Sequence, residues 1–221
     1  MSRRFDAVLF DLDGTLLDTL GDIAESANAA LGQLGLPGWS MEAYRNFIGD
    51  GVENLARRII PAEHHRPEIV QQFGQLCREE YGRRWTHSTR PYPGIPELLD
   101  VLSVQQVPMA VLSNKPDEFT QQCVERFLGR WRFRQVLGDR PGLPRKPDPT
   151  GALQIAQALQ TPPERILYLG DTKTDMQTAR SAGMFAVGAL WGFRTGEELL
   201  AHGAQQLISH PLELLPLLGL A

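Results

Sequence analysis

The sequence predicts an α/β fold in which a parallel sheet carries helices on both faces and a helical cap is inserted after the first strand. Three observations predict it. Residues 5–10 form a short apolar run that ends at an aspartate, as a buried strand would. Residues 41–90 are rich in charge and contain no convincing strand. Downstream, short apolar runs alternate with helical patterns, as in consecutive βαβ units. We therefore expect a core domain of residues 1–16 and 91–221 and a cap domain of residues 17–90.

The expected cap consists of helices. Residues 18–34 carry apolar positions at helical spacing, with Asp18 and Thr19 as expected cap residues and Gly35 at the end. Three further helices are expected over residues 41–48, 52–60 and 67–85. Pro91, Pro93 and Gly94 then predict a stiff connector that leads back into the core.

Each later strand of the expected core is a short apolar run followed by a helical pattern. Strands are expected at residues 107–113, 134–138, 165–171, 185–190 and 206–209. Helices are expected after residue 94 and over residues 116–128, 148–159, 174–183 and 196–203. This alternation is typical of a Rossmann-like parallel sheet, in which ligands bind where the carboxyl ends of the strands converge.

Composition narrows the class of protein. The chain has 221 residues, 42% of them hydrophobic and 22% charged, with a net charge of −4. A nucleic-acid partner is not expected, because binding to phosphates normally requires a basic protein. A membrane partner is not expected either, since no run of about 18 apolar residues occurs. The apolar run after Arg3 and Arg4 is too short for a signal peptide, so we expect a cytoplasmic protein. The expected oligomeric state is a monomer or a homodimer.

The two cysteines, Cys77 and Cys123, form no disulfide framework or zinc motif. The stretch "CREEYGR" places Arg83 at the spacing of a cysteine-dependent phosphatase loop. Glu79 and Glu80 would repel a phosphate there, so we interpret this stretch as one polar face of a helix.

Polar residues gather where the expected strands end. Asp11 and Asp13 follow the first strand, and an acidic pair, Asp171 and Asp175, follows the strand at 165–171. The remaining members of this set are Ser113, Asn114, Lys115 and Lys146. Because the carboxyl ends of parallel strands meet at one edge of a sheet, we expect these side chains in one crevice.

The residue types indicate phosphoryl chemistry. Asp11, Asp13 and Asp171 offer hard oxygen ligands of the kind that Mg²⁺ prefers. Lys146 and the backbone N–H groups after Ser113 offer a cradle for an anion. An aspartate is already ionised at neutral pH, so it can attack phosphorus without a base to activate it.

Four segments in order carry a family resemblance: "DLDGTLLDT" from Asp11, "SNKP" from Ser113, "KPDP" from Lys146 and "GDTKTD" from Gly170. The sequence resembles the haloacid dehalogenase superfamily over essentially its whole length, and within it the phosphoglycolate phosphatase-like branch. The resemblance implies a Rossmann-like core, an inserted cap that closes over the site, and Mg²⁺ as cofactor.

The resemblance also implies roles for individual residues. Asp11 would be the nucleophile, and Asp13 would protonate the leaving oxygen and then deprotonate the attacking water. Mg²⁺ would bind the carboxylates of Asp11 and Asp171 and the backbone carbonyl of Asp13, with Asp175 as a direct or indirect acidic contact. Expected substrate-binding residues are Thr15, which also serves the turn, Ser113, Asn114 and Lys146. Lys146 would pair with Asp11 as well as with the phosphate.

The function expected from these residues is magnesium-dependent hydrolysis of a small acidic phosphomonoester, with 2-phosphoglycolate as the substrate. A sugar phosphate phosphatase or phosphomutase of the same fold stays open as the alternative. A carbon–halogen hydrolase is disfavoured, because the resemblance implies no acid at the position of Asp13 in such enzymes. A non-catalytic binding protein is disfavoured by the complete set of acids. Arg45 and the loop "IGDG", residues 48–51, are expected to read the carboxylate of the substrate.

Overall fold

The computed structural model describes residues 4–220 and divides the chain into two compact units. The core unit comprises the residues up to Leu17 and from Pro91 onward, and the cap unit comprises Asp18–Arg90. The chain leaves and re-enters the core through two short strands, β2 (Leu17–Asp18) and β3 (Arg90–Pro91), which pair with each other.

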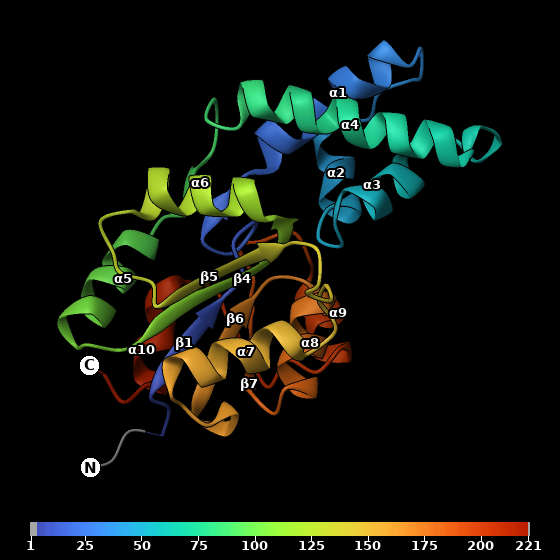
Figure 1. Ribbon diagram of the computed structural model, residues 1–221. Helices are drawn as coiled ribbons and strands as arrows, with labels where there is room; N and C mark the ends of the chain where they lie inside the picture. Colours follow the sequence, from blue (N-terminus) through green and yellow to red (C-terminus); the bar gives the residue numbers. More distant parts are fainter. Residues whose placement is uncertain (1–3, 221) are drawn as a thin grey trace. The chain divides into compact units, whose positions relative to one another are not determined.

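The core unit is built on a six-stranded parallel sheet, as the sequence predicted (Figure 1). The strand order is β5-β4-β1-β6-β7-β8, so the first strand lies in the middle. The strands are β1 (Ala7–Phe10), β4 (Met109–Pro116), β5 (Gln135–Asp139), β6 (Ile166–Gly170), β7 (Phe185–Ala189) and β8 (Gln206–Ile208). In the register, Leu9 lies between Ala110 of β4 and Tyr168 of β6. All four residues of β1 are buried, which explains why this strand is a continuous apolar run.

Helices cover both faces of the core sheet. The core helices are α5 (Ile95–Val104), α6 (Asp117–Leu128), α7 (Thr150–Leu159), α8 (Lys173–Ser181), α9 (Gly196–Ala201) and α10 (Leu214–Leu217). Ile155 of α7, Met176 of α8 and Leu199 of α9 belong to one buried cluster with Leu9 and Tyr168 of the sheet. Figure 1 shows α5 and α6 on the other side. Helices α7, α8 and α9 thus bury their apolar faces against the sheet, and polar residues occupy the ends of the strands.

Strand β4 extends three residues beyond its predicted end at Ser113. The pairing with β5 runs from Leu112↔Leu137 to Pro116↔Asp139 with a register shift between these pairs. Between these two pairs β4 advances by four residues and β5 by only two. β4 therefore forms a bulge, and this bulge carries Ser113, Asn114 and Lys115. Bulges re-aim side chains and are common beside active sites.

The cap unit consists of the helices α1 (Leu20–Gln33), α2 (Met41–Phe47), α3 (Val52–Ile59) and α4 (Pro67–Arg84), with a 3₁₀ turn at Ala62–His64. Tyr44, Ile59 and Phe73 are among its fully buried side chains. The "CREEYGR" stretch lies inside α4. Glu80 is buried there and pairs with Arg83 and Arg84, so this stretch forms a helix face and no phosphate loop.

The start of α1 differs from its prediction. Thr19 occupies the N-cap position, but its side chain makes no capping hydrogen bond, and its buried hydroxyl has no partner. The acid that orders this end is Asp22, whose carboxylate is fully buried. It accepts hydrogen bonds from the backbone N–H and the hydroxyl of both Ser88 and Thr89, at 2.7–3.0 Å. The last residues of the cap are thereby attached to its first helix.

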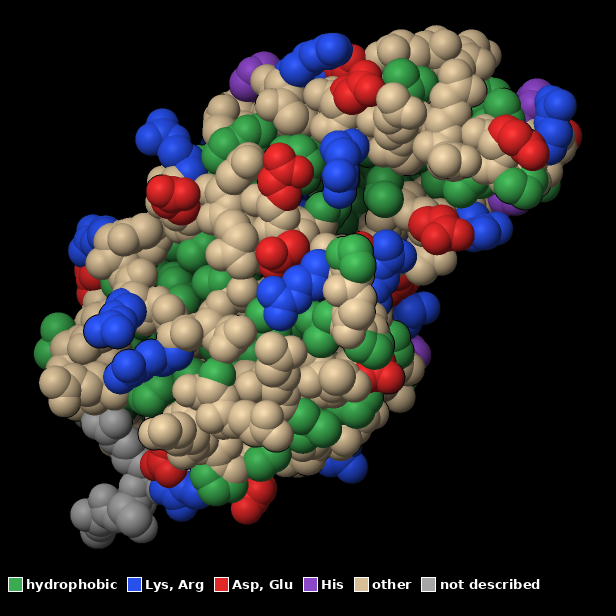
Figure 2. All heavy atoms as spheres, viewed as in Figure 1, with side chains coloured by type: hydrophobic (Ala, Val, Ile, Leu, Met, Phe, Trp, Pro, Cys, Tyr) green, Lys and Arg blue, Asp and Glu red, His purple; other side chains and the backbone are tan. Residues whose placement is uncertain are grey.

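On the face of the molecule drawn in Figure 2, acidic and basic side chains are interspersed. That face offers no continuous basic stripe of the kind that binds nucleic acids. Among residues 4–220, no helix is both long enough and apolar enough to cross a membrane.

Candidate active site

The turn after β1 carries Asp11 and Asp13. The N–H of Asp11 donates to Leu169 O at 2.9 Å, so Asp11 still lies in the strand register. Gly14 follows with φ +86°, and a Cβ there would lie 2.3 Å from Asp171 Oδ2. The position therefore requires glycine for two reasons. Its backbone conformation is one that residues with a side chain rarely adopt, and Asp171 approaches too closely to leave room for a Cβ.

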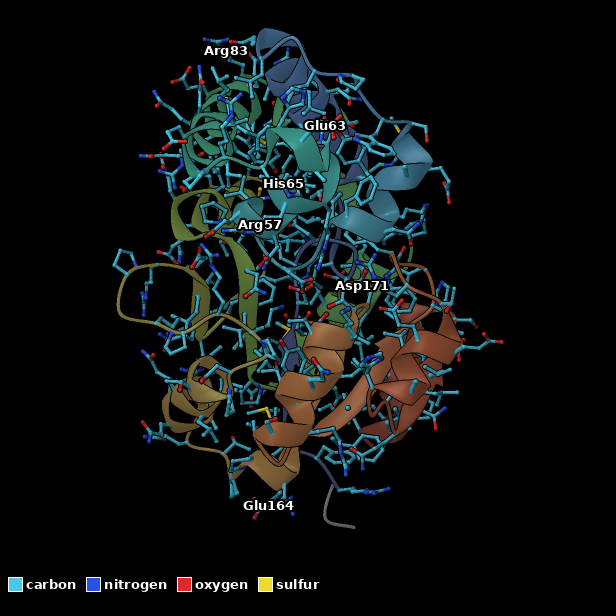
Figure 3. All side chains as sticks on the ribbon, turned by 90° about the vertical axis from the view of Figure 1, so that its right-hand side faces the viewer. Arg57, Glu63, His65, Arg83, Glu164 and Asp171 are labelled. Atoms are coloured by element: carbon cyan, nitrogen blue, oxygen red, sulfur yellow. The ribbon has the colours of Figure 1, made fainter. Side chains whose placement is uncertain are left out.

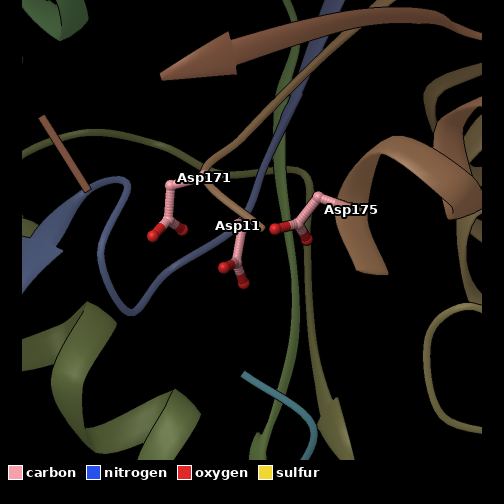
Figure 4. A group of neighbouring side chains, drawn as sticks. All are labelled: Asp11, Asp171 and Asp175. Atoms are coloured by element: carbon pink, nitrogen blue, oxygen red, sulfur yellow. The ribbon is translucent and has the colours of Figure 1, made fainter. Parts of the chain in front are cut away.

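Three carboxylates converge at this edge of the sheet (Figure 4). One oxygen each from Asp11, Asp171 and Asp175 can be chosen so that all three lie within 4.8 Å of one another. In Figure 3, Glu164 lies at the lower edge of the core unit and Asp171 lies well above it. Glu164 precedes β6 and Asp171 follows it, so the cluster lies at the carboxyl ends of the strands. The sequence predicted this convergence.

Lys146 is the cation of the cluster. Its buried ammonium donates to Asp11 Oδ1 at 2.8 Å, to Asp175 Oδ1 at 2.7 Å and to Leu112 O at 3.0 Å. Burial alone would lower the pKa of Lys146, but the carboxylates of Asp11 and Asp175 raise it well above its usual range. Its three hydrogens all have acceptors, so a direct hydrogen bond to a substrate phosphate requires one of these bonds to be exchanged.

Asp175 belongs to the start of α8 and to the cluster at once. Its Oδ2 accepts from the N–H and the hydroxyl of Thr172, which forms a capping box with Asp175 at the N3 position. Its Oδ1 accepts from Lys146 and, at 3.3 Å, from the hydroxyl of Tyr168. Asp175 therefore has its oxygens more fully occupied than Asp11 or Asp171.

Asp171 is held by two neutral donors. Its Oδ1 accepts from the Thr15 hydroxyl at 2.9 Å, and its Oδ2 accepts from the N–H of Phe193 at 2.7 Å. Burial is the main reason that the pKa of Asp171 rises to about 7, and the nearby carboxylate of Asp175 adds to the effect. Burial and Asp175 likewise raise the pKa of Asp11 against the opposing effect of Lys146.

The substrate-side residues expected from the sequence lie beside these acids. Thr15 donates its single hydroxyl hydrogen to Asp171 and is fully buried, so it orients a carboxylate in this state. The side chain of Asn114 bonds the backbone of Lys146 twice, at 2.9 and 3.1 Å, and so ties β4 to the segment before α7. Ser113 accepts the N–H of Lys115 at 3.2 Å, which leaves its hydroxyl hydrogen available to an anion.

One residue of the site received no role from the sequence. Lys115 donates to both oxygens of Asp13, at 2.9 and 3.1 Å, and its side chain is 4% exposed. A compositional signal could have indicated it. Only three of the 22 basic residues are lysines, namely Lys115, Lys146 and Lys173, and each falls within one of the four motif segments.

The donor set fits a divalent cation. Lys146 contacts Asp11 and Asp175, Lys115 contacts Asp13, and Asp171 lies within 4.8 Å of the first two carboxylates, so the site holds four carboxylates and two ammonium groups. Fully ionised, these six groups carry a net charge of −2, which is costly in a buried site. A hard divalent cation would cancel this charge, and carboxylate oxygens are the ligands that Mg²⁺ prefers.

We predict that Mg²⁺ raises the melting temperature of the metal-free protein, and more at pH 8 than at pH 5.5. Because the pKa of Asp171 rises from its usual 3.8 to about 7, the metal-free fold binds this proton more tightly than the unfolded chain does. The contribution of Asp171 to the stability of the metal-free fold therefore falls as the pH rises from 3.8 to about 7. Bound Mg²⁺ offsets this loss. At 100 times its Kd, one Mg²⁺ stabilises the fold by about 2.7 kcal/mol.

Thermal melts with and without Mg²⁺ at both pH values test this prediction. In Asp171→Asn both the pH dependence of the Mg²⁺ shift and the shift itself should shrink, and Asp11, whose pKa burial also raises, should account for the pH dependence that remains. An equal shift at both pH values in the unmodified protein would contradict the prediction.

Comparison with known proteins shows which family the chain belongs to. A family model described as haloacid dehalogenase-like hydrolase matches residues 8–189. A phosphoglycolate phosphatase of Pseudomonas putida is 31% identical over 213 residues, which cover 95% of this chain and 78% of the relative. An N-acetylmuramic acid 6-phosphate phosphatase of Pseudomonas aeruginosa is 32% identical over 219 residues, which cover 99% of this chain and 96% of the relative.

Solved structures agree with these relatives. A crystal structure from Lactobacillus delbrueckii subsp. bulgaricus, provisionally described as a phosphoglycolate phosphatase, matches with a TM-score of 0.91 at 31% identity. The match covers 98% of this chain and 99% of that one. The fold and the relatives together define a hydrolase of phosphoric monoesters. The chain belongs to the haloacid dehalogenase-like hydrolase family.

Proposed function

We propose that the protein is a magnesium-dependent phosphatase that hydrolyses a small phosphomonoester bearing a carboxylate, with 2-phosphoglycolate as the leading substrate. The observation that carries the mechanism is the environment of Asp11. It directly follows the central strand β1, shares Lys146 with Asp175, and lies within ligand distance of Asp171. The substrate is supported by the relatives that bear the name phosphoglycolate phosphatase.

In the first proposed step, an oxygen of Asp11 attacks phosphorus opposite the ester oxygen. The new bond from Asp11 to phosphorus forms as the bond to the ester oxygen breaks, and Asp13 gives its proton to that oxygen. Lys146 keeps one oxygen of Asp11 fixed, which orients the other toward the phosphoryl group. Ser113 and the backbone N–H of Asn114 hold phosphate oxygens.

In the second step Asp13 takes a proton from water, and the resulting hydroxide attacks phosphorus. The bond between phosphorus and Asp11 breaks, which releases inorganic phosphate and restores the carboxylate. The carboxylates of Asp11 and Asp171 and the backbone carbonyl of Asp13 would hold Mg²⁺, with Thr15 and Phe193 orienting Asp171. When bound, Mg²⁺ neutralises charge on the phosphoryl oxygens.

A second candidate substrate has a specific observation in its favour. The N-acetylmuramic acid 6-phosphate phosphatase is as similar to this chain as the Pseudomonas putida relative is, at 32% identity compared with 31%. The sugar in that name also carries a carboxylate. Both candidates therefore require the enzyme to accept a substrate that joins a phosphate to a carboxylate, and they differ in size.

A side-by-side kinetic comparison tests the substrate. We expect kcat/KM for 2-phosphoglycolate to exceed that for alkyl phosphates without a carboxylate by at least about tenfold. The reason is that one charge-assisted hydrogen bond to the carboxylate contributes roughly 1.5–3 kcal/mol. N-acetylmuramic acid 6-phosphate and a hexose 6-phosphate complete the set, and free phosphate is the measured product. If a sugar phosphate is hydrolysed about 100-fold more efficiently than 2-phosphoglycolate, the second candidate replaces the first.

The same assay separates phosphatase from phosphomutase. Release of one inorganic phosphate for each ester consumed supports hydrolysis, whereas an isomeric sugar phosphate without free phosphate supports a mutase. Chelation followed by readdition of Mg²⁺ tests the cofactor. Full activity after the metal has been removed would contradict its role.

A further inference from the structure

Lys115 and Asp13 form an ion pair at the edge of the candidate site. The Lys115 ammonium lies 2.9 Å from Asp13 Oδ1 and 3.1 Å from Asp13 Oδ2, so it contacts both oxygens. The exposed fractions of the two side chains are 4% and 13%. Water therefore screens this pair weakly, and its geometry is defined more strictly than that of a surface ion pair.

The backbone on the Lys115 side is anchored at both of its polar groups. The N–H of Lys115 donates to the hydroxyl of Ser113 at 3.2 Å, and its carbonyl accepts from the hydroxyl of Thr120 at 3.1 Å. Both partners are buried, and Thr120 lies in the first turn of α6. The β4 bulge thus presents the Lys115 ammonium from a fixed backbone.

We propose that Lys115 is a positioning residue for the proton transfers of Asp13. In the first step one oxygen of Asp13 gives its proton to the leaving oxygen while Lys115 holds the other oxygen. Once the proton has left, the carboxylate regains both contacts with the ammonium, as in the structure. The attraction therefore grows during the step, which favours the transition state over the ground state. This inference rests on the function proposed above.

The leaving group of the substrate distinguishes this role from a general structural one. An alkyl phosphate such as 2-phosphoglycolate releases an oxygen that needs a proton, whereas p-nitrophenyl phosphate releases a phenolate that needs none. Removing a well-placed general acid commonly costs 10²- to 10⁴-fold in rate. Loss of Lys115 should therefore slow transfer from the alkyl phosphate selectively.

The experiment compares wild type with Lys115→Met in rapid-quench single turnovers with both substrates. For Lys115→Met we expect transfer from 2-phosphoglycolate to fall at least about 100-fold in rate, with KM within about threefold. Transfer from p-nitrophenyl phosphate should stay within about threefold. In multiple turnovers this substrate should then give a burst of one p-nitrophenolate per enzyme, because an Asp13 carboxylate that Lys115 no longer orients is badly placed to activate the water of the second step.

Three variants act as controls. Lys115→Arg keeps a cation and should recover at least about tenfold of the loss. If Lys115→Met does not fold, Lys115→Gln replaces it, and the ratio of the transfer rates with 2-phosphoglycolate and p-nitrophenyl phosphate is measured on that variant. Arg130→Met removes a cation from the exposed ion pair with Asp100 and should leave the transfer rates with both substrates unchanged.

Equal losses with both substrates, or a wild-type rate with 2-phosphoglycolate, would overturn the inference while leaving the proposed phosphatase intact. If the wild type released phosphate from neither compound, nor from any other phosphomonoester, the proposed function would fail first. The two failures are therefore distinguishable.

Discussion

Asp11→Asn is expected to lower kcat by at least about 10⁴-fold while the protein stays folded. The amide has nearly the shape of the carboxylate but is a far poorer nucleophile, and each tenfold loss corresponds to about 1.4 kcal/mol of barrier. The fold should tolerate the change because burial and Asp175 disfavour the charged form of Asp11, as its raised pKa indicates. Lys146 keeps its contacts with Asp175 and with Leu112 O.

Steady-state phosphate release, circular dichroism and thermal melting measure these effects. Asp100→Asn is the matched control, since it makes the same chemical change in an exposed ion pair of the core unit. Residual activity of Asp11→Asn above about a tenth of the wild-type value would rule out Asp11 as the nucleophile. Acid-quenched wild-type enzyme should carry labelled phosphate from the substrate, and Asp11→Asn should carry none.

Lys146→Met is expected to have the second largest effect, acting on both activity and stability. The variant leaves Asp11 and Asp175 buried beside one another without their shared cation. Removing one partner of a buried ion pair typically lowers the free energy of unfolding by about 3–5 kcal/mol. We also expect kcat/KM to fall at least about 10³-fold, because Asp11 loses the contact that orients it.

A double variant separates these two consequences of losing Lys146. Lys146→Met combined with Asp175→Asn removes one of the two uncompensated charges, so part of the lost stability should return in urea titrations. The activity should not return, because Asp11 still lacks its cation. A Lys146→Met enzyme within about tenfold of the wild type would contradict the proposed role.

The sequence predicted the sheet and the convergence of the acids because both follow from local patterns and one topological rule. Apolar runs marked the strands, and the carboxyl ends of parallel strands must meet at one edge. Asp11 and Asp171 could therefore be placed together although β1 and β6 are far apart in the chain. The resemblance implied that Lys146 pairs with Asp11, and the structure contains this pair, but the sequence did not indicate the other pairings within the site.

The pairing of Lys115 with Asp13 depends on the bulge in β4, which no local sequence pattern predicted. The Asn114 side chain likewise bonds the Lys146 backbone, a contact that needs the tertiary structure to bring the two segments together. At α1 the expected cap residue Thr19 makes no capping bond, while Asp22 accepts four hydrogen bonds from the distant Ser88 and Thr89. Propensity indicates which residue can cap a helix, but packing decides which residue does.

The central place of β1 has a consequence for how the chain folds during synthesis. Val8 lies between Met109 and Leu167, so β1 leaves the ribosome long before either neighbouring strand exists. The cap unit, whose contacts are local by comparison, can form in that interval, and local contacts form faster than distant ones. Asp11, the proposed nucleophile, and Lys146 are 135 residues apart and meet only late in synthesis. We therefore expect nascent chains that end before residue 175 to gain no protection from proteases when Mg²⁺ is added, which would make metal binding a reporter of the finished core.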